Sequence, residues 1–264
     1  MKNDLLAINE LFRERVGISE NEMITFETLD YVLEKAAKSI PFENLCIIAN
    51  NTYELTKENL LTKIALRNEG GLCYELNTLL NFFLIENGFK ADLIRGVAFN
   101  HQNQCWNRIG RTHVANLVMH NGELYILDTG FGGNLPLKPV PLNGEAITSE
   151  NGEFRVKKEE SEHGDYIFEM KLKHKDKDWK AGYAFDSNKV VKDIGELNEI
   201  QKMILEHDES PFNKKPLINR ITDNGNITLT NSSFTEWTDG IVKKEEIDED
   251  KFKELLKEHF RLSI

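Results

Sequence analysis

The stretch whose residues point most clearly to catalysis runs from Gly70 to Asn77 and reads Gly-Gly-Leu-Cys-Tyr-Glu-Leu-Asn. From there to Gly88 the apolar residues recur at helical spacing, so Cys73 lies in the first turn of a predicted helix. Unpaired backbone N–H groups and the positive end of the helix dipole face a side chain at that position. This environment favours the thiolate, which is the nucleophilic form of cysteine. The alternative interpretation is a buried cysteine at the start of a core helix.

A catalytic cysteine needs a base, and the base needs a group that orients it. His113 begins a stretch of alternating strand pattern, and the following Asn121-Gly122 pair favours a two-residue type I′ hairpin. In that register His120 faces Glu123, and His113 and Asp128 share one face as diagonal neighbours. Asp128 can then hold the tautomer of the imidazole and stabilise its protonated form. The pattern thus predicts His113 and Asp128 as the partners of Cys73.

A zinc site formed by His101, Cys105 and His113 is the rival interpretation of this region. Its spacing matches no familiar pattern of zinc ligands, and the strand register already gives His113 a partner. Cys46 and Cys105 are interpreted as core or loop thiols. We therefore expect no metal site.

The composition limits the classes of protein to which the chain can belong. With 264 residues, 40% of them hydrophobic, the chain can bury a sizeable core. A net charge of −11 argues against general nucleic-acid binding. Three scattered cysteines do not suit a disulfide framework, and neither a signal peptide nor an apolar stretch of membrane-spanning length is evident. We expect a cytoplasmic protein without membrane association.

The order of the predicted elements indicates an α+β fold in three parts. Residues 1–88 read as a helical bundle, with helices over 4–16, after Thr25, from Thr56 and from Cys73. Residues 89–193 hold strand candidates at close spacing without helices, which favours an antiparallel sheet or barrel. Residues 194–264 mix a helix, a probable hairpin around Asn224-Gly225 and a last helix capped by Asp248.

Several separated motifs resemble those of the arylamine N-acetyltransferases. The segment Pro41-Phe42-Glu43-Asn44-Leu45 is similar to the signature after the family's second helix. The stretch from Gly70 to Asn77 resembles the family's Arg-Gly-Gly-x-Cys-x-Glu-x-Asn element, and Thr112-His113 and Asp128-Thr129-Gly130-Phe131-Gly132 resemble its His and Asp-Val-Gly-Phe-Gly elements. Ser210-Pro211-Phe212 is similar to its lid motif. The resemblance covers the whole chain at matching spacings.

This resemblance implies a fold and a reaction. The implied fold is a helical bundle, an antiparallel β-barrel and an α/β lid, with a papain-like triad of Cys73 as nucleophile, His113 as proton partner and Asp128 as orienting group. The implied reaction is acetyl transfer from acetyl-CoA to an arylamine, arylhydroxylamine or hydrazine, as in xenobiotic metabolism. The resemblance places Phe42, Phe131 and Phe212 in the acceptor and acyl pocket. It places Thr112 and Gly132 near coenzyme A.

One position departs from the family pattern. The family has arginine immediately before Gly70, where this chain has Glu69. The family's arginine would face the glutamate matched by Glu43, so two carboxylates would repel here unless a cation such as Arg67 pairs with one of them. Thr129 replaces valine, a change of nearly equal shape that adds a hydroxyl.

Two other functions remain compatible with these residues. One is a cysteine hydrolase or amidase with the same triad, for which water is the acceptor. The other is a catalytically weak homologue retained for ligand binding. Glu69 is the only support for the second, and the intact triad opposes it.

Overall fold

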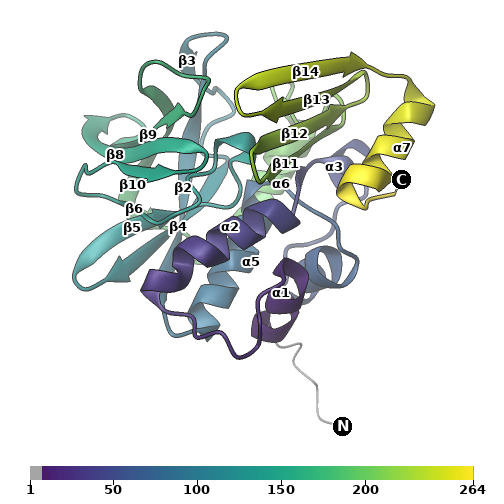
Figure 1. The fold of residues 1–264 in the computed structure, drawn as a ribbon. Coiled ribbons are helices and arrows are strands. Elements are labelled where there is room, and N and C mark those ends of the chain that lie inside the picture. The colour runs from purple at the N-terminus through teal and green to yellow at the C-terminus, as the bar shows by residue number, and fades with distance from the viewer. Residues whose placement is uncertain (1–7, 264) are drawn as a thin grey trace.

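Helices form the first part of the chain (Figure 1). The computed structural model describes residues 8–263, so Leu5 of the predicted first helix lies outside the described residues. The helical elements are α1 (Ile8–Val16), η1 (Phe26–Thr28), α2 (Leu29–Ser39), α3 (Leu45–Ile48), α4 (Lys57–Leu60), η2 (Leu61–Leu66) and α5 (Cys73–Glu86). Apart from α3, these elements meet in one core that includes Phe12, Leu33 and Phe83. The predicted helical segment is confirmed.

Helix α5 is the most deeply embedded of these helices, because eleven of its fourteen residues are buried. It ends as the sequence predicts, with Gly88 in the left-handed region at φ +84°. The helix predicted from Thr56 is only partly right. The Thr56 side chain accepts a hydrogen bond from the backbone N–H of Asn59 as a cap, but α4 widens after one turn into the π-helix η2.

An antiparallel sheet of nine strands follows and curls towards a barrel. Its strands are β2 (Lys90–Asn100), β3 (Cys105–Trp106), β4 (His113–His120), β5 (Glu123–Leu127), β6 (Val140–Pro141), β7 (Ile147–Ser149), β8 (Gly152–Ser161), β9 (Gly164–Leu172) and β10 (Lys180–Val190). The order is β6-β5-β4-β2-β10-β9-β8-β7, with β3 beside β2. Strand β6 also contacts β8, so the barrel nearly closes. Its interior is filled by Phe154, Phe168 and Phe185.

The hairpin between β4 and β5 has the predicted register. His120 pairs with Glu123 and Asn116 with Leu127. Asn121 and Gly122 both have positive φ, at +50° and +86°, as a type I′ turn requires. The strand pairing ends at Leu127, so Asp128 lies in the loop directly after β5.

The last part of the chain combines a second sheet with two helices. The sheet has the order β1 (Phe42–Glu43), β11 (Leu217–Thr222), β12 (Gly225–Thr230), β13 (Ser233–Thr238) and β14 (Ile241–Glu246). Helix α7 (Glu249–Phe260) packs on it, and the Asp248 side chain caps this helix as predicted. Helix α6 (Gly195–Glu206) packs instead into the apolar cluster that holds Cys73.

Two details of this sheet differ from the sequence prediction. Thr222 pairs with Gly225, so the tight turn consists of Asp223 and Asn224, and Gly225 already belongs to the strand. A Cβ on Gly225 would lie 1.9 Å from the carbonyl oxygen of Trp237, which explains why glycine stands there rather than in the turn. Strand β1 comes from the helical part of the chain and adds to the edge of this sheet, which places Phe42 beside the third part.

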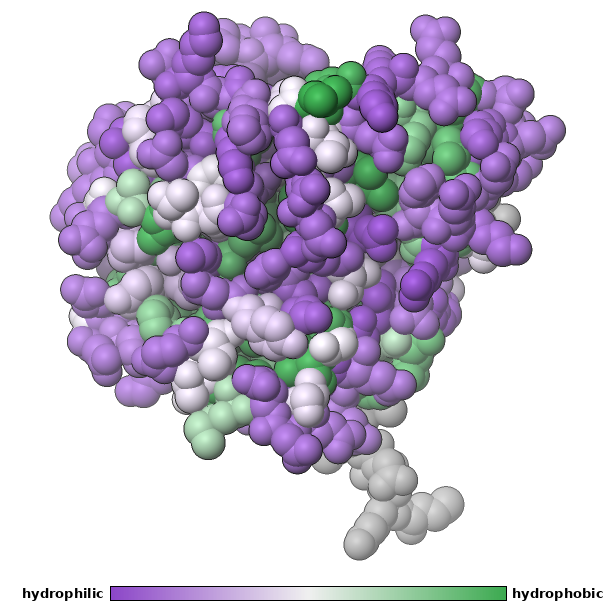
Figure 2. Space-filling model, in the orientation of Figure 1, coloured by the Kyte–Doolittle hydropathy of each residue, from purple (hydrophilic) through white to green (hydrophobic). Residues whose placement is uncertain are grey.

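The face of the molecule in Figure 2 is largely hydrophilic, with apolar side chains in small separate patches. Among the helices of residues 8–263, none is long and apolar enough to cross a membrane.

Candidate active site

Cys73 is the first residue of α5 and is 5% exposed. Its thiol donates a hydrogen bond to the carbonyl oxygen of Thr112, with 3.4 Å between the two atoms. Thr112 directly precedes β4, so the start of the helix and the start of the strand meet at the sulfur. The predicted position of Cys73 in the first helical turn is thus what the structure has.

His113 and Asp128 form a buried pair beside this sulfur. The Nε2 atom of His113 lies 2.7 Å from Oδ2 of Asp128, and the two residues are 5% and 1% exposed. The Cys73 sulfur lies near enough to the imidazole to help hold its proton. The three side chains therefore lie next to one another, in the order that general-base activation of a thiol requires.

Asn77 holds this arrangement from the next turn of α5. Its Nδ2 donates to Oδ1 of Asp128 and to the carbonyl oxygen of Val114, both at 2.8 Å. Its Oδ1 accepts from the backbone N–H of Thr129 at 3.0 Å, and the Thr129 hydroxyl lies 3.3 Å away. Sequence reasoning assigned no role to Asn77, although its position four residues after Cys73 places both on the same side of the helix.

Gly130 lets the loop after β5 lie directly against the helix. A Cβ at this position would lie 2.5 Å from the Cα of Cys73 and 2.7 Å from Nδ2 of Asn77. The backbone N–H of Gly130 donates to Oδ1 of Asp128 at 2.7 Å. A larger residue would therefore separate the carboxylate from the nucleophile.

The surroundings keep a proton on His113. Burial disfavours the charged ring, but the Asp128 carboxylate and the Cys73 sulfur more than offset this and raise the pKa of His113 to about 10. At neutral pH the ring beside the Cys73 sulfur is thus an imidazolium.

Aromatic rings surround the imidazole and the sulfur. The Phe131 ring lies 4.9 Å from that of His113, and the Tyr183 ring lies 4.3 Å away. Phe42 and Phe212 contact each other edge to face at 5.6 Å, and both border the apolar cluster that contains Cys73. The structure therefore places Phe42 and Phe212 at the cluster that holds Cys73, and Phe131 beside His113.

Known proteins share this sequence pattern and architecture. A family model described as N-acetyltransferase matches residues 25–264. A probable arylamine N-acetyltransferase 3 of Dictyostelium discoideum is 33% identical, over 91% of this chain and 87% of that protein. The crystal structure of an arylamine N-acetyltransferase from Bacillus cereus is 40% identical, with a TM-score of 0.92, over 97% of this chain and 99% of that one. The chain belongs to the arylamine N-acetyltransferase family.

A further relative and a detail of the Bacillus cereus structure add to this comparison. An uncharacterized acetyltransferase, YvcN, of Bacillus subtilis (strain 168) is 38% identical over 91% of this chain and 93% of that protein. The Bacillus cereus structure is described as having a unique Cys-His-Glu catalytic triad. The carboxylate that contacts the histidine in this member of the family is Asp128.

Tyr183 is a neighbour of the triad that sequence reasoning missed. Its ring is fully buried and stacks on Phe168 at 4.8 Å. Burial, followed by the negative charge of Asp128, raises the pKa of its hydroxyl well above the ordinary value. The tyrosine therefore stays neutral beside the imidazole. Its position in a predicted strand, 70 residues after His113, gave no signal of this contact.

Glu69, where the family has arginine, and Glu43 each pair with a different cation. Glu69 forms an ion pair with Arg67, with 2.9 Å between Oε1 and Nε, as the sequence analysis allowed. Glu43 instead faces Lys63, which is buried together with it. The Thr129 hydroxyl, the other departure, points to Asn77.

The remaining cysteines and histidines do not join the site. Cys46 and Cys105 are free thiols, and burial together with nearby carboxylates raises the pKa of Cys46 to about 11 despite the opposing charge of Lys63. The Nε2 of His101 lies 2.8 Å from the carbonyl oxygen of Ala181. Within residues 8–263 no cluster of three or more His, Cys, Asp and Glu side chains could hold a metal ion.

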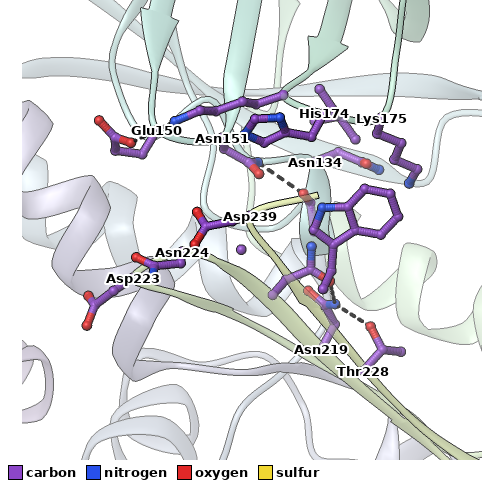
Figure 3. A pocket seen from close by; sticks show the side chains of 16 residues that line it. Asn134, Glu150, Asn151, His174, Lys175, Asn219, Asp223, Asn224, Thr228 and Asp239 are labelled. Atoms are coloured by element: carbon purple, nitrogen blue, oxygen red, sulfur yellow. Dashed lines mark hydrogen bonds and ion pairs between the residues drawn. The ribbon is translucent and has the colours of Figure 1, made fainter. Parts of the chain in front are cut away.

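A separate polar pocket of about 200 Å³ lies between the barrel and the second sheet (Figure 3). It begins at Gly133, directly after the loop that carries Phe131 and Gly132. Asn151 donates to the carbonyl oxygen of Gly133 at 3.0 Å, and Trp237 closes the pocket from β13. Its polar lining contrasts with the aromatic surroundings of Cys73.

Proposed function

We propose that this chain transfers the acetyl group of acetyl-CoA to an arylamine, arylhydroxylamine or hydrazine by a ping-pong mechanism. The observation that carries the proposal is the buried chain of contacts from Cys73 through His113 to Asp128. Cys73 is the nucleophile, His113 the proton partner and Asp128 the group that orients the ring. Family membership supports this reaction type.

Each half-reaction needs one attack and one proton transfer. In the first, the Cys73 thiolate attacks the thioester carbonyl of acetyl-CoA, and the coenzyme A thiolate leaves with the proton of His113. In the second, the amine nitrogen attacks the acetyl-cysteine, His113 takes the proton of the amine, and Cys73 leaves as thiolate. The raised pKa of His113 supports the first step, because the ring carries a proton at neutral pH.

We assign the acceptor and acyl pocket to Phe42, Phe131 and Phe212. Their aromatic rings suit a flat apolar amine, and their position around Cys73 supports the assignment. Thr112 and Gly132 are assigned to the neighbourhood of coenzyme A. Thr112 contacts the sulfur through its carbonyl group, and a Cβ on Gly132 would lie 3.8 Å from the Phe42 ring. A coenzyme A complex of the related Mycobacterium marinum enzyme is consistent with this donor.

We divide the chain at the same boundaries as the sequence indicates. Residues 1–88 supply the nucleophile and residues 89–193 supply His113 and Asp128. Residues 194–264 form a lid that brings Phe212 to Phe42. The three free cysteines suit a reducing cytoplasm, and the net charge of −11 opposes nucleic acid as a partner.

The deciding experiment is an intact mass measurement after mixing the protein with acetyl-CoA. We expect one added acetyl group, its removal by an arylamine such as an aniline, and parallel double-reciprocal plots at varied donor concentration. Acetylation that persists in Cys73→Ala, or intersecting plots, would refute the mechanism.

The hydrolase alternative predicts a different fate of the acetyl group. If water is the acceptor, coenzyme A is released at the same rate with and without arylamine, and no acetylated amine is formed. A homologue that only binds its ligand would show no acetylation of Cys73.

A further inference from the structure

A second group of buried charges lies beside the first turn of α5. It consists of Lys63 from η2, Glu43 from β1 and Glu75 from α5, which are 5%, 2% and 7% exposed. The mechanism proposed above uses none of them. Buried charged side chains are rare unless they are paired, so this group needs an explanation.

Lys63 joins the two carboxylates. Its Nζ lies 2.5 Å from Oε1 of Glu75 and 3.9 Å from Oε1 of Glu43. Each glutamate uses its other oxygen to accept a backbone N–H. Oε2 of Glu75 accepts from Leu72 at 3.0 Å, and Oε2 of Glu43 accepts from Leu45 at 2.6 Å. The lysine thus stabilises two carboxylates that in turn hold the backbone.

These backbone positions adjoin the reacting groups. Leu72 directly precedes Cys73, so Glu75 fixes the residue that sets the start of the nucleophile's helix. Glu43 directly follows Phe42 in β1, and the N–H of Glu43 donates to the carbonyl oxygen of Gly71 at 3.0 Å. A Cβ on Gly70 would lie 2.7 Å from Cγ of Glu43, and one on Gly71 would lie 2.8 Å from Oε2 of Glu75, so each glycine packs directly on one of the two glutamates.

The backbone around Lys63 is itself held in an unusual conformation. In η2 the N–H of Arg67 donates to the carbonyl oxygen of Thr62 at 2.9 Å, five residues back, as in a π-helix. Nε of Arg15 donates to the carbonyl oxygen of Ile64 at 2.8 Å and fixes the same turn from α1. A cavity of about 20 Å³ beside Lys63 and Glu75 has room for a water molecule.

We propose that Lys63 is a positioning residue for the acetyl transfer, because it is the cation that faces both Glu43 and Glu75 and thereby fixes Cys73 and Phe42. This inference rests on the proposed function of Cys73. Without the lysine, two carboxylates would stand unpaired in the same buried site. They would repel each other and release the loop from Gly70 to Leu72. Cys46, Tyr74 and Glu69 also approach this site, and none of them is a cation.

The test compares three variants. Lys63→Met removes the buried cation. Lys63→Met/Glu75→Gln also removes one carboxylate, but the oxygen of the new amide can still accept from Leu72. Lys57→Met is the matched control, because Lys57 lies on neighbouring α4 and makes a partly exposed ion pair with Glu86. For each variant we would measure the single-turnover rate of acetylation by acetyl-CoA and the rate of Cys73 alkylation by iodoacetamide between pH 5 and 10. The temperature is kept below each melting transition.

We expect Lys63→Met to be acetylated about 100-fold more slowly than the wild type, the size of effect known for small misplacements of reacting groups. Its alkylation profile should move to higher pH, because the sulfur is displaced from His113. Unfolded protein would expose Cys73 and add a second labelling phase with the midpoint of a free thiol, near about pH 8.5, and would leave the midpoint of the folded phase in place. The double variant should be acetylated within about tenfold of the wild-type rate, and Lys57→Met should match the wild type.

Two results would overturn the inference. One is a folded Lys63→Met with the rates and alkylation profile of Lys57→Met. The other is a folded double variant that is still acetylated about 100-fold more slowly than the wild type. This second result decides the question even if Lys63→Met does not fold. If wild-type Cys73 is never acetylated, the proposed function fails, whereas the alkylation profiles still test the positioning by Lys63.

Discussion

Two buried ionic groups lie on opposite sides of the first turn of α5. Cys73 belongs to one and Glu75 to the other, and two residues correspond to a rotation of about 200° around a helix. In the first group, the Asp128 carboxylate faces the His113 imidazole. Asn77 and the backbone N–H of Gly130 donate further hydrogen bonds to this carboxylate. In the second, one lysine serves two carboxylates.

This difference in charge balance separates a reactive group from a static one. Around His113 the negative groups raise the pKa of the ring to about 10, so the ring is protonated at neutral pH and, in the proposed mechanism, gives this proton to the leaving group. Around Lys63 there is one negative charge too many. Burial and the charge of Glu75 therefore raise the pKa of Glu43, although Lys63 opposes the shift. The helix start thus has a side that exchanges protons and a side that holds the backbone.

The strongest test of the comparison is to remove the nucleophile from the reactive side. Cys73→Ala should abolish acetyl transfer, whereas Cys46→Ala, near Lys63, should leave the rate within about twofold. Turnover of acetyl-CoA with an aniline measures both. Substantial transfer by the first variant would mean that the nucleophile lies elsewhere.

The next largest effect is expected at the orienting carboxylate. Asp128→Asn keeps the shape but can present an N–H to Nε2 of His113, which favours the wrong tautomer. We expect kcat to fall by about 10⁴-fold, as for the matching change in a serine protease triad. The melting temperature serves as the control for folding. A loss of less than tenfold in a folded variant would show that Asp128 does not orient the ring.

The thiols on the two sides should differ in reactivity. Cys46 has a pKa of about 11, so only about one part in ten thousand is thiolate at pH 7. Iodoacetamide should therefore label Cys73 at least about 100-fold faster than Cys46 at this pH. Peptide mapping after limited labelling measures the ratio, and faster labelling of Cys46 or Cys105 would contradict the assignment of the reactive thiol.

The excess negative charge near Lys63 predicts a pH dependence of stability. The pKa of Glu43 is raised from its ordinary value of 4.5, so the folded state binds a proton that the unfolded state releases. This contribution is complete below pH 4.5 and is lost as the pH rises through the raised pKa.

Glu43→Gln should accordingly weaken the pH dependence of the melting temperature between pH 5 and 8. The variant keeps a side-chain oxygen that can accept from the N–H of Leu45. Thermal melts at a series of pH values decide the question, with Glu34→Gln, at a partly exposed position of α2, as the control. An unchanged slope would mean that Glu43 is not the group that titrates.

The smallest effect concerns Glu69. Glu69→Arg would lose the surface ion pair with Arg67, which contributes little. It would bring a second cation near Glu43, whose pKa Glu69 raises slightly. We expect a gain of about 1 kcal/mol at pH 8, or about 2–4 °C in melting temperature. The gain should shrink at pH 5. Equal melting temperatures of Glu69→Arg and the wild type at pH 8 would show that Lys63 already stabilises Glu43 and that a second cation adds nothing.

Much of this structure could be predicted from residues that lie close together in the sequence. Helical spacing and Gly88 fixed both ends of α5, because a period of 3.6 and a left-handed cap act within a few residues. The Asn121-Gly122 turn set the register of β4 and β5, because a type I′ turn admits one pairing of its flanking strands. That register brought His113 near Asp128 in the prediction, and their contact in the structure follows from it.

The tertiary structure decided what depends on residues far apart in the chain. Lys63 and Glu75 belong to different helices, and no period in the sequence joins a lysine in a π-helix to a carboxylate beside the nucleophile. Tyr183 and Phe212 reach the site from β10 and from the segment after α6 only when the barrel curls and the second sheet takes up β1. By itself the sequence determined which groups could react. Burial determined which charges must be paired, because only the folded chain removes them from water.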